Sequence, residues 1–558
     1  MRHRIRAALG RKAKTLTGTV AILLLVFASL AGCSQTSLAP LPLTTEQKVE
    51  DFRYLSQVFL DSNPYLWVSE RKTGYDWPAH LDEFETEIAA TKDDQEFALA
   101  MTRILGLLNN GHTGLLQKRA ASLYGGFLVG LQMKQWKSEV LKTTGERIDY
   151  WIDLANWHPT STGYAGSAFS AVYARGEYIV VGVNPQIAAG GVTIKPGWEV
   201  RAIGGVPAHE HVKQLLGKQP LWYDPIRDRL YQRWLRVPSV GVGGTNSGPV
   251  SVLFQTEEGG TVSTVSVDIP EEISGGGATY SWPPKYEVTS SRKTSSSNMF
   301  TILLDGNVAY VQIRSMIHNH KGDMALLRRF LTETNPKALI IDIRGNGGGS
   351  DNYWQALVSM LVAEPVRSPG GLVWRKSEYA RPFIEQKGGA RWPIVSRSHL
   401  ETQATAGRVP PEILTPAFEE ARAWDRTVNP SGDSIRFEGK ICLLVDDYVF
   451  SSAESFAAFC KGSGWATVIG SFTGGDGIGF DPALVTLPNS GMLVRFPLVM
   501  GLNPDMSANE EQHTTPDVLA EWDPKDILAY ASMPGGPERP DPAWDPQLRA
   551  CLEWLAGE

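Results

Sequence analysis

Two apolar runs, about 100 residues apart, place the strongest constraint on the fold of this chain. They are Lys337–Ile343 (KALIIDI) and Lys440–Val445 (KICLLV), and neither alternates between apolar and polar residues along its length. A strand of this kind is buried on both faces, which is typical of a parallel sheet covered by helices. The sequence therefore predicts an α/β core around these two runs.

The neighbouring segments continue the alternation of strand and helix. We predict strands at Val308–Ile313 and Thr467–Ile469, and helices at Asp323–Thr332 and Ala453–Lys461. The core is assigned to residues 299–535, with an irregular insertion at 366–438 and a C-terminal tail at 536–558. The length of the insertion makes it a candidate lid.

The N-terminal part of the mature chain has the period of helices. Apolar residues recur every three or four positions through residues 46–118, which predicts a helical region, and Asp93, Asp94 and Gln95 favour the start of one helix. The region ends in the turn Gly111-His112-Thr113, which places a histidine just beyond a buried helix.

Residues 119–220 are expected to form a second, β-rich domain. Its stretch from Tyr178 to Leu216 runs strand, small-residue helix, Pro-Gly turn, strand, Gly-Gly turn and helix, and it resembles a PDZ domain. Such a domain captures an extended peptide by strand addition; the alternative is an unrelated small β-rich insert. Residues 221–298 are expected to be a connecting segment and linker, since Ser and Gly dominate their second half.

The N-terminus has the layout of a secretory signal. Basic residues precede the apolar run Val20–Ala31, which spans roughly 18 Å as a helix and is too short for a bilayer core of about 30 Å. The sequence Leu30-Ala31-Gly32-Cys33 resembles the lipobox of bacterial lipoproteins, which implies a signal peptide at 1–32, lipidation of Cys33 and a tether at 33–45. The alternative is an unmodified cysteine after an ordinary signal. The resemblance implies a lipid-anchored protein of the bacterial cell envelope, and Ser34 favours the outer membrane, facing the periplasm.

Composition and motifs exclude several other classes of protein. With 53 basic and 60 acidic residues the chain is mildly acidic, which argues against a nucleic-acid partner. No GxGxxG, P-loop, HExxH or CxxC pattern is present, so we expect neither a nucleotide cofactor nor a metal. Cys442 and Cys460 could be bridged or remain buried thiols.

Chemistry-bearing residues follow both apolar runs. The first leads into Gly345-Asn346-Gly347-Gly348-Gly349, whose amides could face a ligand without interference from side chains. The second leads to Ser451-Ser452 at a helix start. A serine in this position either caps the helix or is a nucleophile in the positive potential of the helix N-terminus.

The pair DIRGNGGG and VDDYVFSSAESFAAF resembles the C-terminal-processing (tail-specific) and tricorn-core serine peptidase family. The resemblance implies a Clp-protease/crotonase-like peptidase core, preceded by a helical region and a PDZ domain. It also implies that the nucleophile lies three residues before Glu454, at Ser451, with Ser452 as the competing choice. The oxyanion hole would then be built from the amides of Gly347 or Gly348 and of Ser452.

The chain departs from the Ser-Lys branch of that family, because Asp476 lies where that branch has its lysine base. Its residues match the tricorn-like Ser-His-Glu branch instead. That match implies His112 as the base and Glu510 as the acid, with Glu511 as an alternative, although His513 stands where glycine is usual.

These observations predict a serine endopeptidase that cleaves peptides or unfolded polypeptides near their C-termini through an acyl-enzyme. It would need no cofactor, and a lipid at Cys33 would attach it to a membrane. The rival interpretation is a non-catalytic lipoprotein that binds a peptide or other ligand on the same scaffold.

Overall fold

The structure is a computed structural model, and its described part begins at residue 42. It comprises residues 42–125, 133–156, 168–185, 187, 193–218, 221–231, 235–237, 250–258, 261–269, 286, 296–317, 320–531, 533 and 538–557. The expected signal peptide 1–32, Cys33, most of the tether and most of the Ser- and Gly-rich linker lie outside these residues. Within them, no helix has the length and apolar character needed to cross a membrane.

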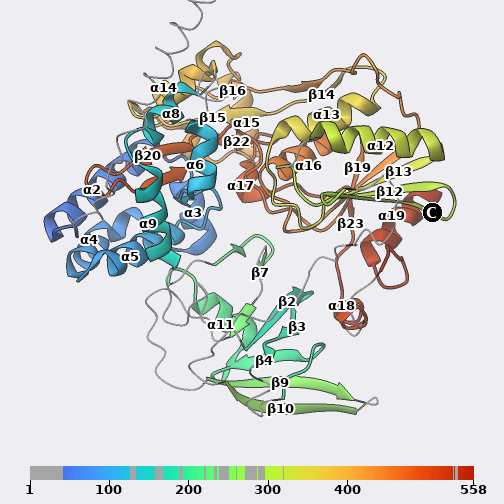
Figure 1. Cartoon of the computed structure of the whole chain (residues 1–558), viewed down its shortest axis with the longest axis horizontal. Helices are drawn as coiled ribbons and strands as arrows, with labels where there is room; N and C mark the ends of the chain where they lie inside the picture. The colour runs from blue at the N-terminus through green and yellow to red at the C-terminus, as the bar shows by residue number, and fades with distance from the viewer. Residues whose placement is uncertain are drawn as a thin grey trace, which may run out of the picture. The chain divides into compact units, whose positions relative to one another are not determined.

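A six-stranded sheet forms the centre of the C-terminal half (Figure 1). Its strands, in spatial order, are β11 (Met299–Leu304), β12 (Val308–Ile313), β13 (Ala338–Asp342), β18 (Lys440–Val445), β19 (Thr467–Gly470) and β23 (Val518–Leu519). β11 pairs with β12 in antiparallel fashion, and all other neighbours are parallel. The prediction of an α/β core is confirmed.

Both faces of this sheet are covered, which explains the continuous apolar runs. Leu339 and Ile341 pack on one side with α12 (His320–Thr334), α13 (Asp351–Leu361) and α16 (Ser452–Ser463). Ile340 packs on the other side with α19 (Pro546–Ala556). Because the two parallel strands β13 and β18 end at the same edge of the sheet, the glycine run and the serine pair emerge side by side.

Cys442 of β18 is bonded to Cys551 of α19, and Cys460 is a buried free thiol. The bridge between Cys442 and Cys460 that the sequence left open is therefore absent. The physical reason is the alternation of the strand: Cys442 faces α19, whereas Cys460 belongs to the cluster on the opposite face.

Helices form the N-terminal region and continue beyond residue 118, where the sequence predicts that the helical region ends. They are α2 (Thr45–Ser62), α3 (Leu66–Thr73), α4 (Leu81–Ala90), α5 (Asp94–Gly106), α6 (Lys118–Gly125), α8 (Lys134–Val140) and α9 (Gly145–Asn156), with the 3-10 turn η1 (Pro78–His80). Asp93 caps α5 by accepting a hydrogen bond from the Glu96 amide. The last three helices lie in the segment expected to be β-rich, because buried Ile148 and Trp151 recur at helical spacing and Trp151 packs edge-on against Phe97.

The β-rich sheet begins at Phe169 and continues beyond residue 220 (Figure 1). Its path is β10 (Thr261–Ile269), β9 (Val250–Glu258), β4 (Glu199–Ile203), β3 (Glu177–Val183), β2 (Phe169–Ala174) and β8 (Leu235–Val237); β5 (Val206–Pro207) pairs with β4 and leads into α11 (Ala208–Gln214). A small hairpin, β6 (Tyr223–Asp224) with β7 (Arg229–Leu230), follows α11. Part of the expected connecting segment 221–298 is thus sheet, since β9 pairs along β4.

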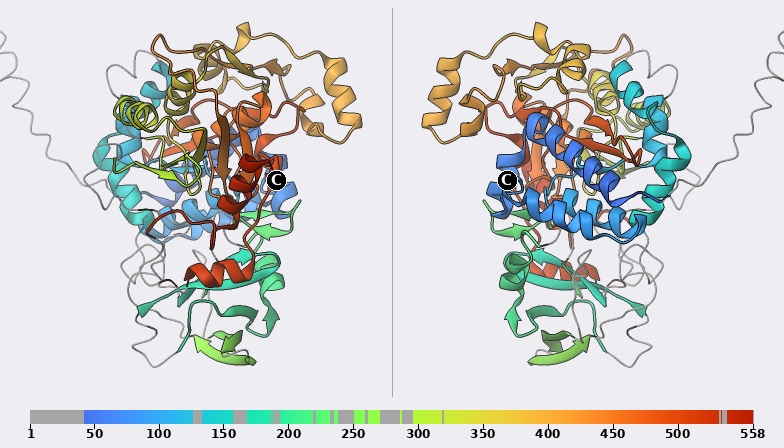
Figure 2. Two further views of the ribbon diagram at one scale, coloured as in Figure 1. Left: turned by 90° about the vertical axis from the view of Figure 1, so that its right-hand side faces the viewer. Right: turned by 90° about the vertical axis from the view of Figure 1, so that its left-hand side faces the viewer.

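The 366–438 insertion is joined to the rest of the molecule by pairing of one of its strands with a strand outside it, and its part near residue 400, orange in Figure 2, lies at the edge of the molecule. It contains β14 (Val366–Ser368), β15 (Gly371–Val373), α14 (Arg381–Gln386), η2 (Gly389–Arg391), α15 (Arg397–Thr405), η3 (Pro411–Leu414), β16 (Arg422–Ala423) and β17 (Arg426–Val428). β14 pairs with β17, and β15 pairs with β16 and with β22 (Met500–Leu502). Val373 is fully buried beside Tyr65 and Val68 of the N-terminal helices, so this part of the insertion is packed core.

A three-stranded sheet connects the N-terminal region to the core. It consists of β1 (Gly114–Leu115), β21 (Leu493–Phe496) and β20 (Ala483–Thr486), with Gly114 opposite Arg495. Two short helices, α17 (Asn509–Gln512) and α18 (Pro524–Ala531), complete the C-terminal region. The pairing of β1 with β21 holds the turn that carries His112 against the core.

Candidate active site

Ser451 lies at the point where the chain turns from β18 into α16. Its backbone has φ 56° and ψ −125°, and its side chain makes no hydrogen bond that caps the helix. A positive φ is unfavourable for a residue with a Cβ, and such positions gather at functional sites. The capping interpretation therefore does not apply to Ser451, whose hydroxyl is directed elsewhere.

The Ser451 hydroxyl meets the imidazole of His112. His112 Nε2 lies 3.0 Å from Ser451 Oγ, although 339 residues separate the two in sequence. The His112 ring packs against Phe450 with 4.7 Å between centroids. Ser452, the competing candidate, points away from the imidazole: its hydroxyl is buried and donates to the sulfur of Met316.

The other ring nitrogen of His112 bonds to Asp476, with 2.7 Å between Nδ1 and Oδ2. Asn110 connects the two residues, because its Nδ2 donates to Asp476 Oδ2 at 2.9 Å while its Oδ1 accepts from the His112 amide at 2.9 Å. Burial acts to raise the pKa of Asp476, but His112 and Asn110 outweigh it, and the pKa lies below its ordinary value of 3.8. An ionised Asp476 then requires a proton on Nδ1, which leaves Nε2 as an acceptor facing Ser451.

Neither of the two expected glutamates contacts His112. Glu510 is buried and forms an ion pair with Lys72 at 2.9 Å, and Lys72 also donates to the Tyr231 hydroxyl at 2.8 Å. Burial works against the charge of Lys72, yet Glu510 and Tyr231 raise its pKa above the ordinary value. Glu511 binds Arg71 instead. The expected contact between Glu510 and His112 is thus corrected: the acid on the imidazole is Asp476.

Asp476 lies in the loop after β19, at the same sheet edge as Ser451, and has φ 51°. Two glycines beside it allow close packing: a Cβ on Gly477 would lie 2.4 Å from the Ser455 amide, and one on Gly475 would lie 2.7 Å from the His513 ring. The signal in the sequence was an acid between glycines after a buried strand. The comparison with the Ser-Lys branch hides this signal, because that branch has a lysine at the position of Asp476.

The glycine run lies against the start of α16. A Cβ on Gly348 would lie 2.7 Å from both the Phe450 carbonyl and the Ser452 amide, and φ at Gly348 is +96°. The Gly348 amide already donates to Asn346 Oδ1 at 2.9 Å. Gly347 is exposed with open space around its Cα, and the Ser452 amide, at the first position of α16, has no carbonyl to bond within the helix.

A cavity of about 510 Å³ opens over these groups. It is lined by Gly111, His112, Trp222, Ser315, Ile317, Gly347, Gly348, Gly349, Phe450, Ser451 and Arg495. Most of this lining is apolar or glycine, with few polar groups, as is usual for a binding cavity. The cavity contains both Ser451 and His112, so a substrate held there would reach them.

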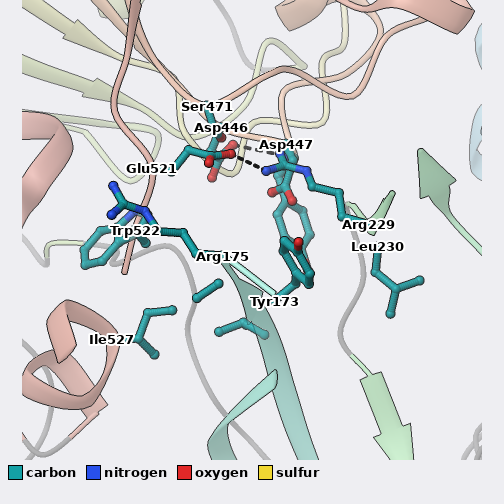
Figure 3. A pocket seen from close by; sticks show the side chains of 13 residues that line it. Tyr173, Arg175, Arg229, Leu230, Asp446, Asp447, Ser471, Glu521, Trp522 and Ile527 are labelled. Carbon is teal, nitrogen blue, oxygen red and sulfur yellow. Dashed lines mark hydrogen bonds and ion pairs between the residues drawn. The ribbon is translucent and has the colours of Figure 1, made fainter. Parts of the chain in front are cut away.

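A second, smaller cavity of about 60 Å³ lies where the β-rich domain meets the core (Figure 3). Arg229 bonds to Glu521 beside it, and Asp446 lies in its wall. Asp446 accepts two hydrogen bonds from the Gly345 amide at 3.0 and 3.1 Å. Burial, and then the neighbouring Asp447, raise the pKa of Asp446 to about 8. The lining of this cavity contains neither Ser451 nor His112, and Asp446 in its wall holds the start of the glycine run through the Gly345 amide.

His513 occupies a position that favours glycine. Its φ is 58°, and its ring is buried against Tyr231 with 4.9 Å between centroids. Burial, and then Lys72, lower the pKa of His513 from 6.5 to about 3, so the ring is neutral in the folded protein.

Across the described residues, no group of three or more His, Cys, Asp or Glu side chains is arranged to hold a metal ion.

Comparisons with known proteins place this arrangement in a class. Residues 307–520 match the model of peptidase family S41. The chain resembles the structure of mature CPAF complexed with lactacystin, with a TM-score of 0.53, 13% identity, and coverage of 92% of this chain and 99% of that one. A second structure of mature CPAF gives a TM-score of 0.51 and 14% identity, covering 87% of this chain and 94% of that one. A search of curated proteins found no match.

Together, the fold and the family model define a serine-type peptidase. The match to peptidase family S41 is confined to residues 307–520, and this segment contains Ser451 and Asp476 but not His112.

Proposed function

We propose that this protein is a serine endopeptidase that hydrolyses peptides or unfolded polypeptides through a triad of Ser451, His112 and Asp476. The observation that carries the proposal is the imidazole of His112, which bridges the Ser451 hydroxyl at 3.0 Å and the Asp476 carboxylate at 2.7 Å. These are the contacts that a base and its orienting acid require, whatever their order along the chain.

In the acylation step, His112 Nε2 takes the proton of the Ser451 hydroxyl while Oγ attacks the carbonyl carbon of the scissile bond. The electron pair moves to the carbonyl oxygen and a tetrahedral intermediate forms. Its collapse expels the amine, which receives the same proton from His112. The products are an ester on Ser451 and the C-terminal fragment of the substrate.

In the deacylation step, water replaces the departed amine. His112 removes a proton from the water as its oxygen attacks the ester, and then returns the proton to Ser451 Oγ. Asp476 stabilises the imidazolium that forms in both steps and holds its tautomer. Asn110 acts as a positioning residue, because it bonds both to the Asp476 carboxylate and to the His112 amide.

The negative oxygen of each tetrahedral intermediate needs donors close to Ser451. We assign this role to the amides of Gly347 and Ser452, since the Gly348 amide is engaged by Asn346. The N-terminus of α16 adds its positive potential at the same place. Removing one such donor from an oxyanion hole typically costs about 10²–10³ in kcat.

A fluorophosphonate probe tests the nucleophile directly. We expect wild-type protein to be labelled at Ser451, and Ser451→Ala to lose both the label and peptide turnover. Ser452→Ala is the matched control, because its hydroxyl faces Met316, and it should keep the label. Labelling that is lost only in Ser452→Ala would move the nucleophile by one residue. Absence of label together with peptide binding and no turnover would support the non-catalytic binding lipoprotein instead.

We further propose that the protein is anchored to the bacterial cell envelope by lipid on Cys33, with the enzyme facing the periplasm. The support is the small-small-Cys pattern that directly follows a short apolar run. Cys33→Ser should release the protein from the membrane fraction and remove the mass of the acyl chains. An unchanged fractionation and mass would contradict the anchor.

A further inference from the structure

Arg495 is a permanent charge in the wall of the active-site cavity. It lies on β21 opposite Gly114, and its Nη2 donates to the carbonyl of Gly111 at 3.1 Å. Gly111 is the residue before His112, so the guanidinium lies on the His112 side of the cavity. Among the described residues that line the cavity, no other is a lysine, an arginine or a carboxylate.

Within the part of the chain that the structure describes, the guanidinium of Arg495 has no acidic partner. None of these residues offers a carboxylate within 4.0 Å of Arg495, whereas Arg71, Arg227, Arg229 and Arg344 each have at least one acidic partner. Asp476 is engaged by His112 and Asn110. Burial lowers the pKa of Arg495, with Tyr124 and Asp476 acting in the opposite direction. A guanidinium has five N–H donors, and Gly111 accepts from one of them. The other donors can bind a planar anion such as a carboxylate.

The other described residues of the cavity wall carry no negative charge. Trp222, Ile317 and Phe450 give the cavity an apolar wall, and a Cβ on Gly111 would lie 2.5 Å from the Trp222 ring and 2.6 Å from that of Phe450. In such surroundings a charge-assisted bond between guanidinium and carboxylate is shorter and stronger than a neutral one. An unpaired cation in an apolar cavity therefore favours an anionic group on whatever binds there.

We propose that Arg495 selects substrates that carry a carboxylate close to the scissile bond, within reach of the His112 side of the cavity. The inference rests on the proposed peptidase function and adds a substrate class to it. The carboxylate could belong to an Asp or Glu side chain or to the free C-terminus of the substrate, and the two sources share the same recognition chemistry.

Binding is measured first without turnover, in full-length Ser451→Ala protein. The probes are fluorescent peptides of one length and one backbone sequence, with Glu or Gln at each position in turn and with a free or an amidated C-terminus. We expect one acidic position, or the free C-terminus, to strengthen binding by about tenfold to a hundredfold over its neutral match. Preference for Glu would identify a side chain as the source, and preference for the free end would identify the terminus.

The preference must depend on Arg495. Adding Arg495→Gln should bring the ratio of affinities for the matched peptides close to one, Arg495→Lys should keep part of it, and Arg495→Glu should invert it toward Lys-containing peptides. Arg397→Gln is the control, since Arg397 is exposed on α15 and pairs with Glu401. An acidic preference that persists in Arg495→Gln, or an equal loss of affinity for every peptide, would overturn the proposal and leave Arg495 as a brace for Gly111.

Turnover in the wild-type chain separates this proposal from the peptidase proposal. The same ratio should appear in kcat/KM, mainly through KM, because the contact exists in the bound ground state. Turnover without an acidic preference would overturn the Arg495 proposal alone. An Arg495-dependent preference in binding, with no turnover of any peptide, would overturn the peptidase proposal alone.

Discussion

The carboxylate of Asp476 lies 2.7 Å from Nδ1 of His112, in the place for which the family resemblance predicts a glutamate. Glu510, the expected acid, is instead the counter-ion of Lys72. Asp476 therefore bonds to the imidazole of His112, whereas Glu510 balances the charge of the buried Lys72 ammonium. Substituting each acid by its amide separates these two roles.

Asp476→Asn should reduce kcat by roughly 10²–10⁴ and slow fluorophosphonate labelling, because an amide no longer fixes the tautomer of His112. The fold should persist, since Asn keeps the shape of the side chain. Steady-state kinetics and the midpoint of urea unfolding check both expectations. A variant with full kcat would remove Asp476 from the triad.

Glu510→Gln should mainly lower stability. It leaves the Lys72 ammonium buried beside Tyr231 without a counter-charge, and losing one partner of a buried ion pair costs about 3–5 kcal/mol. Replacing both partners, as in Lys72→Met with Glu510→Leu, should recover most of that loss. If Glu510→Gln were as stable as wild type but lacked activity, Glu510 would belong to the catalytic chemistry after all.

Gly348→Ala should inactivate the enzyme, whereas Gly347→Ala should not. The new methyl at 348 would meet the Phe450 carbonyl and the Ser452 amide at 2.7 Å, at a φ that adds about 1–3 kcal/mol of strain. The methyl at 347 meets open space, and the amide that we assign to the oxyanion hole remains. Comparing kcat/KM for the two variants is the test; equal activities would mean that Gly348 does not shape the site.

His513 should make stability fall as the pH is lowered from about 6.5 toward 3, whereas the buried carboxyl of Asp446, with its pKa raised to about 8, acts in the opposite direction. Burial depresses the pKa of His513 to about 3, so in that window the unfolded chain binds a proton that the folded chain does not. The slope for one such group approaches roughly 1.4 kcal/mol per pH unit.

The His513→Asn variant should lose part of that slope, since asparagine tolerates a positive φ and does not titrate. His399→Asn on the exposed face of α15 is the control and should keep the wild-type slope. Urea midpoints at pH 7 and pH 5 give the comparison. An identical fall in wild type and His513→Asn would assign the pH dependence to other groups.

The Cys442–Cys551 bond should contribute to stability, because it closes a loop of 109 residues between β18 and α19. Replacing both cysteines by alanine should cost about 2–4 kcal/mol, while Cys460→Ala should cost less. Peptide mapping without reduction should recover a linked pair containing residues 442 and 551. A link between 442 and 460 would contradict the arrangement of the two faces of the sheet.

The core was predictable because burial on both faces leaves a simple pattern. The runs at 337–343 and 440–445 became β13 and β18, and their common edge brought the glycine run to the serine. Ser451 and His112 could also be named in advance, since each lies in a short motif with fixed neighbours.

The contacts of Asp476 and Glu510 could not be predicted from the sequence, because they depend on the paths of loops. Asp476 reaches His112 only because Gly475 and Gly477 let its loop pack against α16 and His513. Glu510 points to Lys72, a residue 438 positions away on α3 that nothing in the local sequence marks as its partner. The helices of 118–156 were missed because short apolar segments fit a strand as readily as a helix.

The distance along the chain between Ser451 and His112 has a consequence for the biogenesis of the enzyme. A nascent polypeptide carries His112 long before it carries Ser451, and the chain between them, a sequence separation of 339, must fold before the two meet. Contacts of such high sequence separation form late, after much of the loop-closure entropy has been overcome. With the proposed triad, hydrolysis therefore requires that the chain has been synthesised and folded past this contact, and a chain that has not yet reached Ser451 lacks its nucleophile.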